Sequence, residues 1–106
     1  RRAAARNSAN PAQSVQRELR SEERAAKKTA SAERRKLEKE VEKLDRELAA
    51  LQAEKSALEG RLADPAVYAD HAAATGLAGQ VATLAELIET AEARWLEIHE
   101  QLDRAG

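Results

Sequence analysis

The lysine and arginine residues of this chain give the clearest indication of a chemistry. Their clustering favours the binding of a polyanion. Residues 1–36 hold eleven of them against four glutamates, whereas residues 37–106 hold seven against fifteen acids. Clustered cations neutralise phosphates and gain affinity by releasing counterions from a nucleic acid. The nucleic-acid-binding candidates are Arg17, Arg20, Arg24, Lys27, Lys28, Arg34, Arg35, Lys36 and, further along the chain, Arg61.

These cations have two interpretations. Residues 1–36 contain no aromatic residue. Base stacking and sequence readout are therefore not expected, and any contact would be with the phosphate backbone. Alternatively, the same segment is a tether whose charges lie in water, because charged segments with few large apolar side chains bury too little to order themselves.

Catalytic and metal chemistry find no support in the sequence. The chain has no cysteine and no phosphate-binding glycine-rich motif. His71 and His99 are far apart in the sequence, and we expect both to be solvated, with no metal ligands and no cofactor held by this chain. No apolar run approaches the roughly 18 residues of a membrane span, so we expect a cytoplasmic location without membrane contact.

The composition is typical of long helices. Alanine accounts for 25 of the 106 residues, there is no phenylalanine or methionine, and charged residues make up 35%. Because methionine is absent even at position 1, we expect the chain to be part of a longer protein. Residues 1–31 contain only Val15 and Leu19 as sizeable apolar side chains, which predicts a basic linker that is disordered or partly helical.

Two apolar seams follow this linker, with the alternating steps of four and three residues that are typical of a coiled coil. The first seam skips one position, at Lys55, and the second skips none. The first predicts a helix over about residues 32–63, with Ser31 as its N-cap. The second predicts a helix over about residues 72–104. The first seam is Leu37, Val41, Leu44, Leu48, Leu51, Leu58 and Leu62, and the second is Leu77, Val81, Leu84, Ile88, Ala91, Trp95, Ile98 and Leu102.

Residues 64–75 are predicted to form the tip between the two helices. Asp64 can cap a short helical turn in which Pro65 takes the first position, and Tyr68 and Val67 are expected to fold over the end of the core. Asp70 or Thr75 can cap the second helix. The fold class is therefore all-α, an antiparallel two-helix coiled-coil hairpin with a short helical turn at its tip, and we expect a monomer.

Antiparallel pairing also sets which residues meet across the hairpin. If Leu62 lies opposite Leu77, then Leu48 lies opposite Ala91 and Leu44 lies opposite Trp95. The small Ala91 next to the bulky Trp95 gives the alternation of sizes that close packing requires. Leu44, Leu48, Ala91 and Trp95 are thus the structural residues of this region, as Asp64, Pro65 and Tyr68 are at the tip.

The strings ALEGRLADPAVYAD and AELIETAEARWLEIHEQL in this sequence resemble the C-terminal coiled-coil domain of Uup-type proteins of the ABC-F family of ATP-binding cassette ATPases. The resemblance covers about residues 33–103. It implies a cytoplasmic parent protein whose ATPase domains precede this chain and bind ATP and Mg. It also implies that the hairpin is an accessory element contacting DNA, ribosomal RNA or the ribosome, next to the ATPase domains of the same chain.

Two further possibilities stay open at this point. The chain can instead be a protein-interaction or spacer arm that binds no nucleic acid, and Leu87 and Leu96, which lie off the seam, are candidate docking residues for it. Coiled-coil arms of aminoacyl-tRNA synthetases also resemble such hairpins. An enzyme activity within this chain is not expected.

Overall fold

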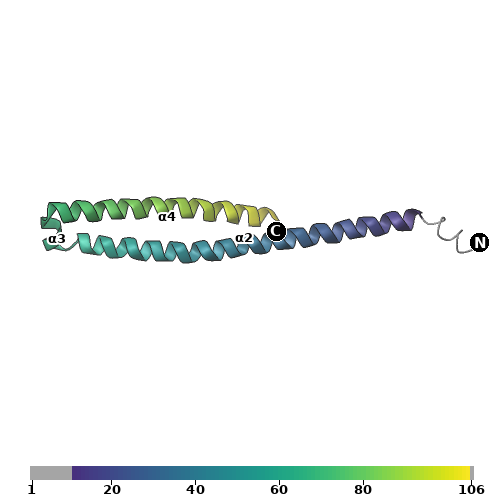
Figure 1. Ribbon diagram of the computed structural model, residues 1–106, viewed down its shortest axis with the longest axis horizontal. Helices are drawn as coiled ribbons and strands as arrows, with labels where there is room; N and C mark the ends of the chain where they lie inside the picture. Colours follow the sequence, from purple (N-terminus) through teal and green to yellow (C-terminus); the bar gives the residue numbers. More distant parts are fainter. Residues whose placement is uncertain (1–10, 106) are drawn as a thin grey trace, which may run out of the picture. The chain divides into compact units, whose positions relative to one another are not determined.

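The computed structural model describes residues 11–105, and these residues form three helices and no strand (Figure 1). Helix α2 covers Pro11–Leu62, α3 covers Pro65–Ala69 and α4 covers His71–Ala105. The chain divides into two units, residues 1–35 and residues 36–106, so that α2 begins in the first unit and ends in the second. The predicted all-α helical hairpin is confirmed.

Helix α2 begins earlier than the helix predicted over about residues 32–63. Residues 11–31 are helical, and Ser31 lies within α2 instead of capping it. The physical reason is local: alanine, arginine, glutamate, glutamine and lysine are strong helix formers, and no glycine or interior proline interrupts them before Gly60. Pro11 suits the first helical turn, where its missing N–H is not needed. Residues 1–10 of the predicted linker lie outside the described residues.

In the second unit, the part of α2 from Lys36 onward runs beside α4 in the opposite direction (Figure 1). The three- and four-residue steps of each seam place its apolar side chains on one helix face, and these faces meet to form the core. Ile98 has no exposed surface at all, which makes it the most buried residue of the core. The buried core residues are Leu44, Leu58, Leu77, Leu84, Ile88 and Ile98.

The chain reverses at residues 63–70. The Asp64 carboxylate accepts a hydrogen bond from the Ala66 backbone N–H at 3.0 Å, and Pro65 occupies the first position of α3. Asp70 then caps α4, because its carboxylate accepts from the Ala73 N–H at 3.2 Å. Thr75 lies inside α4, so the tip is shorter than the predicted span of residues 64–75.

Tyr68 does not fold over the end of the core, and this prediction is wrong. Its side chain is 75% exposed. Val67, one residue earlier, does pack against the cluster around Leu58 and Leu77, as expected. Neighbouring residues of a helix point about 100° apart, and α3 turns Val67 toward the core and Tyr68 toward solvent.

Candidate functional site

One side of α2 in the first unit carries seven cationic side chains. At about 100° per residue, these seven positions fall within an arc of about 120° around the helix. They follow one another at steps of one, three, four or six residues, and every one of them is exposed. We call this set the basic face; it consists of Arg17, Arg20, Arg24, Lys27, Lys28, Arg34 and Arg35.

The acidic residues of the same stretch lie mostly on the other side of the helix. Glu18, Glu22 and Glu33 project from the side of α2 that is opposite the basic face, and Glu23 lies beside its edge. The apolar Val15 and Leu19 also lie on the far side, and both are about half exposed. The positive charges are therefore gathered along one line of about 27 Å, given a rise of about 1.5 Å per residue.

Two predicted binding residues do not belong to this face. Lys36 lies in the second unit. Arg61 is in the last turn of α2, also in the second unit, and is exposed. The face itself could have been recognised in the sequence from its spacing, had a helix been expected for residues 11–31.

The chemistry available to the basic face is recognition of phosphate. A guanidinium presents several N–H donors in a fork that fits two phosphate oxygens, and a lysine ammonium adds a point charge. The residues of the face include no aromatic side chain for base stacking and no acid that accepts from a base. This arrangement can bind a phosphate backbone but does not read a base sequence.

An ion pair joins α2 and α4 across the hairpin in the second unit. Arg94 Nε donates to Glu40 Oε2 at 2.6 Å and Nη2 donates to Glu40 Oε1 at 3.0 Å, while Nη1 donates to Glu97 at 3.0 Å. The hydrogen bonds from Arg94 hold the pKa of Glu40 below its ordinary value. The same bonds raise the pKa of Arg94. The sequence interpretation missed this pair, which joins residues far apart in the chain.

Trp95 makes a second polar contact across the hairpin. Its Nε1 donates to Asp45 Oδ1 at 2.8 Å, and Asp45 directly follows Leu44, the residue predicted to lie opposite Trp95. The His99 ring centroid lies 4.0 Å from that of Trp95. His99 Nε2 is buried without a hydrogen-bond partner, so the expectation that this histidine is fully solvated is wrong.

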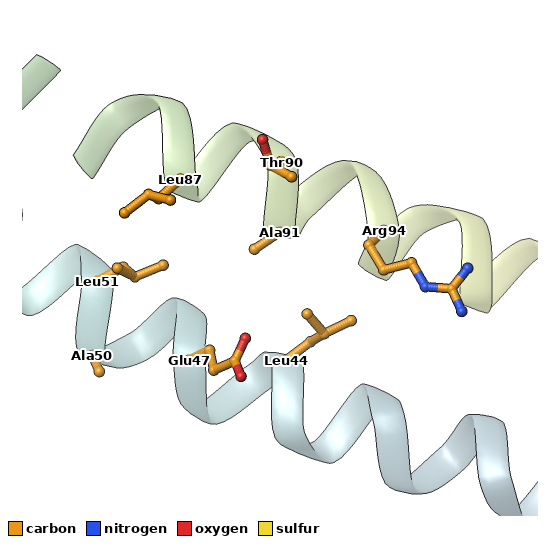
Figure 2. Close-up of a pocket in the computed structure, with 8 residues that line it drawn as sticks. All are labelled: Leu44, Glu47, Ala50, Leu51, Leu87, Thr90, Ala91 and Arg94. Carbon is orange, nitrogen blue, oxygen red and sulfur yellow. The ribbon is translucent and has the colours of Figure 1, made fainter. Parts of the chain in front are cut away.

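A mostly apolar hollow of about 540 Å³ opens between α2 and α4 where Ala91 faces α2 (Figure 2). Leu44 and Leu51 reach toward it from α2, with Leu87 and Ala91 on the α4 side. Trp95 is not among the residues that line this hollow. Leu48, the predicted partner of Ala91, is half-buried and does not line the hollow.

Other kinds of site find no basis in residues 11–105. Nowhere in this stretch do three or more histidine, aspartate or glutamate side chains gather in a way that could hold a metal ion. None of the described helices contains an apolar segment that is long enough to cross a bilayer.

The family described as ABC transporter C-terminal domain matches residues 32–100, which include the end of the basic face, the whole tip and most of α4. Comparison with curated proteins and with solved structures gives no match.

Proposed function

This chain belongs to the ABC transporter C-terminal domain family, and from this premise we propose that it is the accessory domain of a cytoplasmic ATPase and contacts nucleic acid through the basic face of α2. The contact is with the backbone of DNA or ribosomal RNA and is not sequence-specific. The ATPase domains of the parent chain bind ATP and Mg, and this domain holds no cofactor of its own.

The placement of seven cations on one side of an exposed helix supports this proposal. Most of the basic face precedes the residues that match the family. Family membership therefore supports the role as an accessory domain, whereas the charge geometry supports the contact with nucleic acid. A helix that merely stayed in solution could carry its cations on any side. Gathering them along one line of about 27 Å lets a single stretch of duplex meet several at once.

A charge-removal experiment tests the basic face directly. The variant Arg20→Gln, Arg24→Gln, Lys27→Gln removes three of its cations. The matched control Lys39→Gln, Lys43→Gln, Arg46→Gln removes three exposed cations from the same helix, within the second unit. Binding of the 106-residue chain to a 20-base-pair RNA duplex and to the DNA duplex of the same sequence is measured by fluorescence anisotropy at several salt concentrations.

The slope of log affinity against log salt should become shallower by about one unit for each lost phosphate contact. We therefore expect the basic-face variant to lose about three units of slope and the control to keep the wild-type slope. Equal losses in both variants would show that net charge matters and the face does not. Wild-type chain that binds neither duplex at low salt overturns the proposal.

The hollow at Ala91 favours a second candidate function, a protein-interaction arm that docks on the ATPase domains of the same parent chain. Leu87 is about half exposed at the edge of this hollow, where a partner's apolar side chain could insert. For this function, Leu87→Asp would weaken association with those domains, whereas the basic-face variant would not. Unchanged association after Leu87→Asp would remove this candidate.

A further inference from the structure

Ser31 lies at the centre of the basic face. Its position around α2 falls in the middle of the arc that the seven cations span, and its side chain is exposed. Residues three and four positions away lie next to it on the helix surface. In both directions these neighbours are cationic: Lys27, Lys28, Arg34 and Arg35.

The periodicity of the face makes this serine stand out. Arg17, Arg20, Arg24 and Lys27 follow one another at steps of three and four residues, and the next such steps lead to residues 31 and 34. Arg34 continues the line, but residue 31 is a neutral hydroxyl where the line would place a further cation. Phosphorylation of a serine hydroxyl turns this neutral group into a strongly negative one.

We propose that Ser31 is a phosphorylation site for a serine/threonine protein kinase that recognises basic residues before its target, and that the phosphate releases the domain from nucleic acid. The cations at the third and fourth positions before Ser31, Lys28 and Lys27, supply the recognition. This regulation rests on the proposed function of the basic face.

The reaction uses ATP as the phosphate donor. Ser31 Oγ attacks the γ-phosphorus, so that an Oγ–P bond forms while the bond from the γ-phosphorus to the β–γ bridging oxygen breaks. ADP leaves with that electron pair, and the hydroxyl proton passes to the catalytic carboxylate of the kinase. No oxidation or reduction is involved.

The phosphate would act through the neighbouring cations. It carries a charge of about −1.5 to −2 at pH 7 and three strong acceptor oxygens. Arg35 and Lys27, one helical turn away on either side, would pair with it. The phosphate on Ser31 thereby neutralises positive charge at the centre of the basic face, which would otherwise contact the duplex.

A kinase needs its target in an extended conformation, and the local structure allows this. None of residues 11–36 is buried, so their helix depends on intrinsic propensity, which stabilises a helix only marginally in water. Segments with few buried contacts open at low free-energy cost. Ser31 therefore becomes accessible without unfolding the apolar core of the second unit.

Thr29 provides a matched control two residues away. Its Oγ1 donates to the Ala25 carbonyl oxygen at 3.0 Å, and it lies on the side of α2 opposite the basic face. The substitutions Ser31→Glu and Thr29→Glu add the same single charge to the same turn. Any difference in duplex affinity between the two variants is therefore due to the position of the added charge on the helix and not to net charge.

The experiment combines these variants with enzymatic phosphorylation. Binding to the 20-base-pair RNA duplex at about 0.1 M salt is measured for the wild-type chain, Ser31→Glu and Thr29→Glu. One lost phosphate contact corresponds to about an eightfold loss of affinity at this salt concentration. We expect that loss for Ser31→Glu, and a much smaller one for Thr29→Glu. The wild-type chain and Ser31→Ala are then treated with a basic-directed kinase and ATP, and the modified residue is mapped by mass spectrometry.

Treated wild-type chain should carry phosphate on Ser31 and lose about sixtyfold in affinity, equivalent to two contacts, whereas treated Ser31→Ala should keep its affinity. Three results would overturn the inference although the wild-type chain binds the duplex. They are equal losses of affinity for Ser31→Glu and Thr29→Glu, phosphate on Thr29 alone, and no phosphorylation. If the untreated wild-type chain does not bind duplex at all, the proposed function fails and this inference fails with it.

Discussion

Arg94 of α4 donates two hydrogen bonds to the Glu40 carboxylate of α2, across the two arms of the hairpin. The distances are 2.6 Å from Nε and 3.0 Å from Nη2. The pairing is bidentate, so it fixes the orientation of both side chains as well as their separation. Together with the bond from Trp95 to Asp45 at 2.8 Å, it sets the register of the two helices far from the tip. These polar contacts complement an apolar core that is only one layer of side chains wide.

This ion pair makes the stability of the hairpin depend on pH in a defined direction. The pKa of Glu40 in the folded chain lies below its ordinary value of 4.5, so the pair contributes stability above that value and loses it as pH falls through the folded-state pKa. We expect Glu40→Gln to lower the free energy of unfolding at pH 7. The difference from wild type should shrink between pH 5 and pH 3 in urea titrations. Glu42→Gln, exposed on the same helix, is the control, and a constant difference for Glu40→Gln across this range would contradict the assignment.

Two apolar residues of α4 that lie close in sequence should respond oppositely to truncation. Ile98 is completely buried and Leu96 is 55% exposed. Ile98→Ala leaves a cavity in the core and should cost about 2–5 kcal/mol, whereas Leu96→Ala should stay within about 0.5 kcal/mol of wild type. Urea denaturation followed by circular dichroism measures both. Similar costs for the two variants would place the core on a different face of α4.

The hollow at Ala91 predicts a stabilising substitution. Ala91→Leu should extend into the apolar space beside Leu51 and Leu87 and raise the free energy of unfolding by about 0.5–2 kcal/mol. Ala82→Leu adds the same atoms to an exposed position of α4 and serves as the control. A loss of stability in Ala91→Leu, with no change in the control, would mean that the space is already filled in solution.

Backbone hydrogen exchange should differ between the two parts of α2. None of residues 11–36 is buried, whereas Leu44 and Leu58 are, and amides exchange faster where few buried contacts resist local opening. We expect residues 15–35 to exchange at least about a hundredfold faster than residues 44–58, corresponding to about 2.7 kcal/mol of local stability. Uniform protection along α2 would show that residues 11–36 have a stabilising partner.

The hairpin could be predicted from the sequence because its determinants are local and repeated. The alternation of three and four residues in each seam specifies an apolar helix face, and Asp64 followed by Pro65 specifies where a new helix begins. The start of α2 was harder to predict. Alanine-rich charged segments have the propensity for a helix but no burial to enforce one, so a cap at Ser31 was equally consistent with the residues.

The side-chain arrangement around Tyr68 and Arg94 depends on three-dimensional placement that the sequence does not state. Whether Val67 or Tyr68 of α3 faces the core depends on the angle at which a five-residue helix leaves the turn. The partner of Arg94 depends on the reach of a long side chain across a layer, and several acids of α2 lie on that side. The basic face, in contrast, follows from spacing alone once residues 11–35 are helical.

The salt dependence of duplex binding by the unmodified chain is the most direct measurement of whether the basic face of α2 engages a phosphate backbone. With seven cations on one side of the helix, and about 0.9 units of slope for each contact, we predict a log–log slope steeper than about −4 for the 20-base-pair RNA duplex. A slope near zero, or no binding at 0.05 M salt, would contradict the account.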